Sequence, residues 1–199
     1  MSVALSRAIA IAAAQHVVED GLEYGDARRK AARDVAGSRA RGSDLPRNED
    51  IEDEVRTYLA TFHGDTQPGE LLALREVAAR WMERLAPHRP HLSGAVWRGT
   101  ATRRSAVLLD LYCDDSKAAE IDLINAGVDY DVGGGQDERS VPVLTLAERS
   151  AALGDWVTVH LLLHDLDDLR GALQPDRGGH SWRGDLRALR QRMAEATAA

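Results

Sequence analysis

The spacing of apolar residues changes near residue 89, and this change limits the fold more than any other feature of the sequence. Before residue 89, apolar residues recur every three or four positions, as they do along one face of a helix. After it, short apolar runs predict strands, and the strongest of them is 107–113. We therefore expect an α+β protein with a helical region at 1–88 and an α+β domain at 89–199.

The first region is expected to contain four helices. They are predicted at about 3–19, 26–36, 49–62 and 70–85. Acids at 49–54 come directly before the third apolar stripe. Acids are favoured there because they oppose the positive end of the helix dipole. Pro87 and Pro90 close the fourth helix, since proline cannot continue one.

The second region is expected to form one mixed sheet. Strands are predicted at 95–97, 107–113, 128–132, 141–146 and 156–163, and helices at 116–126, 166–173 and 184–196. The odd positions of 107–113 are all apolar, and alternation along a strand places them on one face. This strand is therefore predicted to be central, with Asp110 on its opposite face.

Charge is distributed unevenly along the chain. The formal net charge is −7, which argues against nucleic-acid binding through a general basic surface. Residues 26–47 hold seven Lys and Arg against three acids, whereas 105–138 hold one Lys against nine acids. We interpret Arg28, Arg29 and Lys30 as a solvated helix face, with contact to nucleic acid as the alternative, and the acidic stretch as a helix and loop edge rather than a metal site.

A single cysteine, Cys113, allows no intramolecular disulfide, which favours a cytoplasmic protein. It shares the apolar face of 107–113, so we expect a core residue and not a nucleophile.

The apolar run 8–14 is far too short to cross a bilayer, and no membrane partner is expected. Arg7 before that run is also a feature of signal peptides, but the helical spacing that follows favours a folded helix. The sequence does not indicate an oligomeric state.

The stretch around Gly99 and Thr100 has the residue types of a phosphate site. A strand at 95–97 that turned through Gly99 and Thr100 into a short helix would leave backbone N–H groups and a positive dipole end for an anion. Three nearby arginines, Arg98, Arg103 and Arg104, would add charge for phosphate oxygens. An acid on the next strand, Asp110, could then hold Mg²⁺ beside the phosphates.

This arrangement resembles the nucleotidyltransferase superfamily, especially its small bacterial members, over residues 89–164. The whole chain also resembles an uncharacterised bacterial family labelled nucleotidyltransferase-like. The residues that carry this second resemblance are 21–24, 29–32, 95–102, 113–117 and 120–121. Gly99 matches the superfamily's glycine, Thr100 its serine and Asp110 the first of its strand acids. The second acid would fall at Tyr112, and the third near Thr158 and His160, where this chain has none.

The resemblance implies Mg²⁺-dependent nucleotidyl transfer from a nucleoside triphosphate to an acceptor hydroxyl. Asp110 would be catalytic and, with Asp114, would hold the metal. The nucleotide would be bound by Arg98, Gly99, Thr100, Arg103 and Arg104. The alternative is a catalytically degenerate nucleotidyltransferase fold that acts as a ligand-sensing or protein-interaction module.

The histidines and two tryptophans predict structural roles. His160 and His164 lie on an expected strand, where residues four apart are roughly 13 Å apart and cannot share one metal ion. We expect one of them to be half-buried and the other to lie at the strand end. His88 and His91 bracket Pro90 in what we expect to be a solvated loop, with phosphate steering as the alternative. Trp81 and Trp97 are expected to be core anchors that join the two regions.

Overall fold

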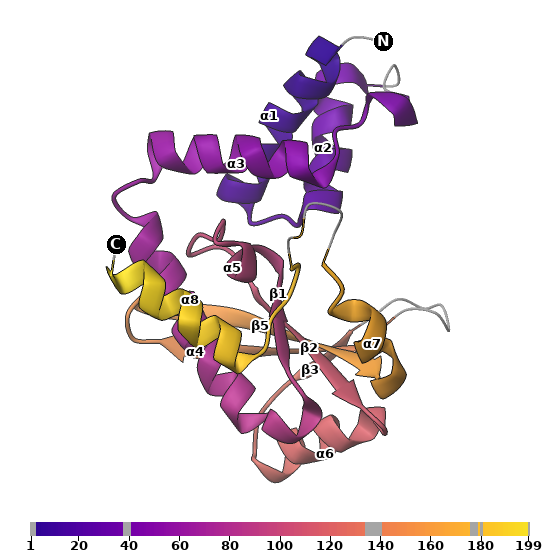
Figure 1. Ribbon diagram of the computed structural model, residues 1–199, viewed down its shortest axis with the longest axis vertical. Helices are drawn as coiled ribbons and strands as arrows, with labels where there is room; N and C mark the ends of the chain where they lie inside the picture. Colours follow the sequence, from indigo (N-terminus) through magenta and orange to yellow (C-terminus); the bar gives the residue numbers. More distant parts are fainter. Residues whose placement is uncertain (1–2, 38–40, 134–140, 176–178, 180, 199) are drawn as a thin grey trace. The chain divides into compact units, whose positions relative to one another are not determined.

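The computed structural model describes residues 3–37, 41–133, 141–175, 179 and 181–198. It confirms the α+β class. The chain forms two compact units, one of residues 1–71 with 100–105, the other of 72–99 with 106–199 (Figure 1). This division differs from the expected boundary at 88/89, because most of the fourth helix belongs to the second unit and the loop 100–105 belongs to the first.

The first unit is helical. Its elements are α1 (Val3–Asp20), α2 (Tyr24–Ala36), the 3₁₀ turn η2 (Gly42–Asp44), α3 (Asn48–Phe62) and the start of α4 (Gln67–Arg84). Alanines and β-branched residues fill the core between α1, α2 and α3, where Ile9, Ile51 and Val55 are completely buried. The basic run on α2 is partly neutralised within this unit: Arg29 pairs with Asp26 and Lys30 with Asp20.

The loop 100–105 packs on the turn between α1 and α2. Thr102 is buried, and its hydroxyl donates a hydrogen bond to the carbonyl oxygen of Val18 at 3.3 Å. Gly21 has a φ of +70°, and a Cβ there would lie 2.7 Å from the carbonyl oxygen of Arg104. Only glycine can adopt this positive φ and leave room for the carbonyl oxygen without strain.

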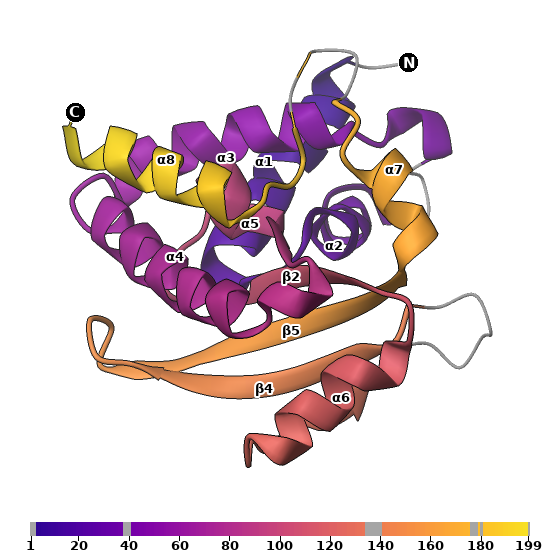
Figure 2. The ribbon, with the colours of Figure 1, turned by 60° about the horizontal axis from the view of Figure 1, so that its bottom comes forward.

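The second unit is built on a five-stranded sheet of order β1-β2-β5-β4-β3. The strands are β1 (His91–Ser93), β2 (Val107–Cys113), β3 (Asp131–Gly133), β4 (Val143–Ser150) and β5 (Asp155–Asp165). β2 lies inside the sheet, antiparallel to β1 and parallel to β5, so the predicted interior position is confirmed. Figure 2 shows β4 and β5 as one long hairpin.

Helices complete the second unit. They are α4, α5 (Gly94–Arg98), α6 (Ser116–Asn125), α7 (Leu169–Ala172) and α8 (Leu186–Ala198), with 3₁₀ turns η3 (Ala86–His88) and η4 (Leu166–Asp168). α5 contacts β1 and β2, α6 contacts β2 and β5, and α8 contacts β1. Trp81 and Trp97 are buried, as expected of core residues, and both belong to the second unit. Within the described ranges, no helix is long and apolar enough to cross a membrane.

The expected strand at 95–97 is wrong, because these residues form the short helix α5. A short apolar run does not distinguish a strand from a buried helix by periodicity alone. Two glycines with positive φ, Gly94 and Gly99, break the extended path on either side. The last turn is then held by side chains, since Arg75 and Arg192 donate to the carbonyl oxygens of Val96 and Trp97.

The expected solvated loop around Pro90 is also wrong. His88 and His91 are both buried, one in η3 and the other in β1. The Nε2 atom of His88 lies 2.8 Å from a carboxylate oxygen of Asp122 on α6. Its Nδ1 atom lies 3.5 Å from the sulfur of Cys113. Cys113 is buried as predicted, and burial raises the pKa of its thiol.

Candidate functional site

Asp110 lies in the middle of β2, and its side chain is almost completely buried, with the residue 3% exposed. Its Oδ1 atom accepts a hydrogen bond from Nε2 of His164 at 2.8 Å. An ionised carboxylate can only accept, so Nε2 of His164 carries the hydrogen. In the neutral ring, Nδ1 of His164 is then the basic nitrogen. This side chain is 16% exposed, so the pair reaches solvent through the histidine.

The second carboxylate oxygen of Asp110 faces an arginine. Nη1 of Arg183 lies 3.3 Å from Oδ2 of Asp110 and donates a 2.6 Å hydrogen bond to the hydroxyl of Tyr112. The Arg183 side chain is 25% exposed. The buried carboxylate is therefore flanked by a permanent cation on one oxygen and an imidazole on the other, which offsets the cost of burying its charge.

Two aromatic contacts complete the group. The ring of Tyr112 stacks on His164 with centroids 5.2 Å apart, and it meets His91 edge-on at 5.5 Å. Nδ1 of His91 donates to the carbonyl oxygen of Arg89 at 2.9 Å. Burial, and then the charge of Asp110, raise the pKa of the Tyr112 hydroxyl. We call Asp110, Tyr112, His164, Arg183 and His91 the Asp110 cluster.

The sheet register brings these residues together. Asp110 and Tyr112 are two apart on β2, so they share a face. His164 pairs with Tyr112 across the parallel β2–β5 ladder, and His91 pairs with Asp110 across the antiparallel β1–β2 ladder. Arg183 arrives from the segment before α8, where its neighbour Gly184 forms a β-bridge to Leu92 of β1. The cluster thus joins three neighbouring strands and a distant segment.

The two predicted metal ligands, Asp110 and Asp114, lie in different environments. Asp110 is buried within the cluster, whereas Asp114 is exposed in the bend after β2. Among the described residues, no group of three or more His, Cys, Asp or Glu side chains is placed to hold a metal ion. The assignment of Asp110 and Asp114 to Mg²⁺ stays a prediction.

The loop that is expected to bind phosphate follows the C-terminal end of a helix and does not lead into the N-terminal end of another. Gly99 ends α5, and its N–H donates to the carbonyl oxygen of Ala95. Residues 100–106 contain no helix, so the short helix expected after Thr100 is wrong. Gly99 therefore lies at the carbonyl end of a helix, where the dipole disfavours anions.

The other predicted nucleotide-binding residues have internal partners. Thr100 is buried, with its Oγ1 3.5 Å from the hydroxyl of Tyr24. The backbone N–H of Arg103 donates to a carboxylate oxygen of Glu70 at 2.9 Å, and the Arg104 guanidinium donates to the carbonyl oxygen of Glu19. These three residues belong to the first unit, whereas Arg98 and Gly99 belong to the second. Their role with a nucleotide stays a prediction.

Arg98 lies beside the segment that carries Arg183. Its guanidinium carbon is 6.0 Å from the ring centroid of Trp182, the residue next to Arg183. Of the sequence-predicted residues, Arg98 and Asp110 are thus brought near one segment of the second unit. Sequence reasoning missed His91, His164 and Arg183. The alternation along the two strands could have placed His164 on the Asp110 face, but no local pattern identifies Arg183, which follows Tyr112 by 71 residues.

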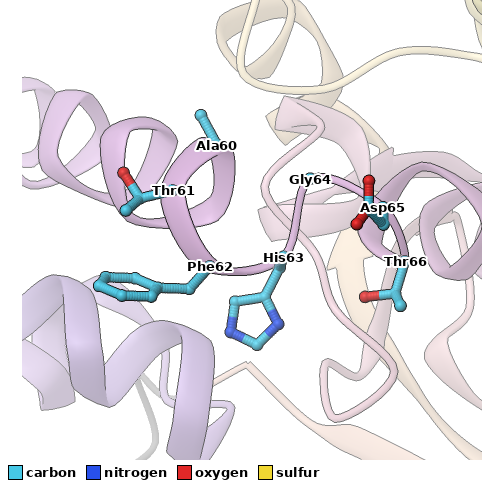
Figure 3. A pocket seen from close by; sticks show the side chains of 7 residues that line it. All are labelled: Ala60, Thr61, Phe62, His63, Gly64, Asp65 and Thr66. Carbon is cyan, nitrogen blue, oxygen red and sulfur yellow. The ribbon is translucent and has the colours of Figure 1, made fainter.

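Two hollows are lined by residues of the first unit, whereas the Asp110 cluster belongs to the second. One of about 240 Å³ is lined by residues 60–66 at the junction of α3 and α4 (Figure 3). There His63 points its ring to Glu19, whose carboxylate also accepts a hydrogen bond from Tyr58, so this histidine has a structural partner. The other, of about 390 Å³, lies beside the ion pair between Arg7 and Glu54.

The chemistry that the second unit offers is therefore that of one acid, one arginine and histidines on a single sheet face. A guanidinium binds the oxygens of carboxylates and phosphates, and an imidazole oriented by a carboxylate can accept a proton. Comparison of the chain with protein-family models, with curated proteins and with solved structures gave no match.

Proposed function

We propose that this chain is a nucleotidyltransferase-like protein that binds a phosphate-bearing ligand, foremost a nucleoside triphosphate, without Mg²⁺-dependent nucleotidyl transfer. The observation that carries the proposal is the ion pair between Arg183 and Asp110. This one pair argues both against a metal on Asp110 and for an anion beside Arg183.

The argument against the metal concerns the carboxylate oxygens. Mg²⁺ needs oxygen ligands and is commonly held by one or two carboxylates together with substrate phosphates. Oδ1 of Asp110 already accepts a hydrogen bond from His164, and Oδ2 forms an ion pair with Arg183 at 3.3 Å, although within the described residues it accepts no hydrogen bond. A metal would have to displace these groups and would leave a guanidinium next to a dication. Transfer by two metal ions makes a stricter demand, because both ions need carboxylates to bridge them.

The argument for an anion concerns the remaining donors of Arg183. Within the described part of the chain, its guanidinium makes its polar contacts through Nη1. The Nε atom is buried and has no hydrogen-bond partner there. Buried polar atoms in folded proteins are almost always paired, so an unpaired donor on a partly exposed arginine is a reason to expect a ligand. Arg98, beside Trp182, adds a second positive charge near the segment that carries Arg183.

Thermal unfolding with and without nucleotides tests the proposal. A ligand that binds only the native state raises its apparent stability. We expect a nucleoside triphosphate to raise the melting temperature equally in EDTA and in Mg²⁺. Arg183→Gln should abolish the rise, whereas Arg187→Gln, which removes an exposed charge from α8, should leave it unchanged. The melting temperature of each variant without ligand checks that it folds.

Two results would contradict the proposal. One is a nucleotide shift that requires Mg²⁺ or Mn²⁺. The other is release of pyrophosphate from the triphosphate that Asp110→Asn abolishes, since this would make Asp110 a metal ligand in an active transferase. No rise with any nucleotide, in either buffer, would remove the nucleotide from the proposal.

A further inference from the structure

The outward side of α6 and the neighbouring strand β3 carry large apolar residues in contact with solvent. Ile121 and Ile124 on α6 are 51% and 60% exposed, and Val132 on β3 is 69% exposed. Single exposed aliphatic residues are normal on a protein surface. A group of them is a feature of surfaces that bind another molecule.

The fold of the second unit does not use these isoleucines. α6 packs on the sheet through Ala119 and Leu123, which are both buried. Ile121 and Ile124 are three residues apart and therefore lie next to each other on the helix surface. A surface helix is ordinarily apolar on one side and polar on the other. α6 is apolar on two sides, only one of which the sheet covers.

A hydrogen bond links α6 to the segment that leads into β3. The hydroxyl of Tyr130 donates to a carboxylate oxygen of Glu120 at 2.9 Å. Glu120 precedes Ile121, and Tyr130 comes two residues before Val132. The three exposed apolar residues thus belong to elements that are tied together. We call Ile121, Ile124 and Val132, together with Asp129 and Asp131, the α6–β3 surface.

The charge around these residues is strongly negative. Asp129 and Asp131 flank Tyr130, and both are exposed. Within the described ranges, neither of them forms an ion pair. From 116 to 133, which spans α6 and β3, Lys117 is the one basic residue against four acids. Such a surface repels acidic and attracts basic partners.

We propose that the α6–β3 surface binds a basic, amphipathic helix of another protein. The isoleucines would contact the apolar side of that helix, and the aspartates would pair with its Lys and Arg residues. An amphipathic helix that lays its apolar side on an exposed apolar surface is a recurring mode of peptide recognition. This interaction is independent of ligand binding at the Asp110 cluster.

The experiment uses the whole chain and a fluorescently labelled helical peptide of leucine and lysine residues as the probe. We expect fluorescence anisotropy to show saturable binding that weakens as salt is raised, because exposed charges are screened. The double variant Ile121→Ser, Ile124→Ser should weaken binding at least about tenfold, as loss of central apolar contacts does. Asp129→Asn with Asp131→Asn should weaken it and reduce its salt dependence.

Matched controls distinguish binding at this surface from nonspecific binding of the peptide to exposed apolar residues. Leu173→Ser removes an exposed leucine elsewhere in the second unit and should leave the peptide's affinity unchanged. A peptide of leucine and aspartate should not bind. The isoleucine variant should keep the melting temperature of the parent chain, since both side chains are exposed. Peptide binding that survives the isoleucine change, or equal binding of the acidic peptide, would overturn the proposal. A dimer of the parent chain that the same change dissociates would also overturn it, because a second copy would then cover the surface.

Discussion

The carboxylate of Asp110 on β2 and the imidazole of His164 on β5 are joined by a 2.8 Å hydrogen bond across two parallel strands. The residue directly opposite Asp110 is Leu162, so the bond runs diagonally to the next residue on the same face. It orients the histidine and satisfies one oxygen of a buried charge. The other oxygen forms an ion pair with Arg183, so a segment 73 residues later in the chain contributes to the same cluster.

Removal of the buried carboxylate should be costly. Asp110→Ala leaves Arg183 and His164 facing an apolar methyl group, and the loss of one partner of a buried ion pair typically costs about 3–5 kcal/mol. The free energy of unfolding from urea titration measures this. Asp114→Ala, which removes an exposed acid from the same region, should change it by less than about 0.5 kcal/mol. Equal effects of the two changes would show that the Asp110 cluster does not stabilise the sheet.

The Tyr112 hydroxyl should ionise only in strong alkali. Burial, and then the charge of Asp110, raise its pKa above the ordinary value of a tyrosine. A raised pKa in the folded state means that this contribution to stability is complete below the unfolded pKa and is lost as the pH rises through the folded one. Spectrophotometric titration of the native chain should show one fewer late-ionising tyrosine in Tyr112→Phe. An unchanged late phase would contradict the prediction.

The single thiol should be slow to react. Burial raises the pKa of Cys113, so little of the reactive thiolate is present at neutral pH, and the buried side chain is hard to reach. A chromogenic disulfide reagent should modify it at least about a hundredfold more slowly in the native chain than in denaturant. The reaction in denaturant is the internal control, and equal rates in the two states would place the thiol at the surface.

The turn between α1 and α2 should accept only glycine at position 21. Gly37 has a positive φ too, but a Cβ there would meet nothing within 4 Å, so Gly37→Ala should cost about 1–3 kcal/mol from backbone strain alone. Gly21→Ala adds a clash with the carbonyl oxygen of Arg104 and should cost at least about 1 kcal/mol more. Urea unfolding compares the two variants. A Gly21→Ala chain as stable as Gly37→Ala would rule out the close approach.

Much of the fold could be predicted from the sequence, because its elements have strong local periodicity. The interior strand β2 was recognisable from the apolar odd positions of 107–113 and from Asp110 on the other face. The helix α5 was not, since five residues are too few to show a helical period and their carbonyl groups are held by arginines 20 or more positions away. The same error reversed the expected polarity of the helix next to Gly99.

The candidate site could be predicted only in part, for a related reason. Sequence analysis singled out Asp110, because it lies on the strand that follows Gly99 and Thr100 and matches an acid of the family that the chain resembles. Its partners come from β5 and from the segment before α8, and pairing between distant segments leaves no mark in local sequence. The buried positions of His88 and His91 were missed because Pro87 and Pro90, which precede them, are typical of exposed loops, whereas here Pro87 lies inside η3 and Pro90 leads into β1.

Binding of Mn²⁺, followed by its electron paramagnetic resonance signal in solution with the whole chain, tests the central claim most directly. Mn²⁺ takes the oxygen ligands that Mg²⁺ prefers. If Arg183 and His164 hold Asp110, the parent chain and Asp110→Asn should leave the same amount of free Mn²⁺, with or without a nucleoside triphosphate after correction for the nucleotide's own binding. Tight binding of one Mn²⁺ by the parent chain that Asp110→Asn abolishes would contradict the account.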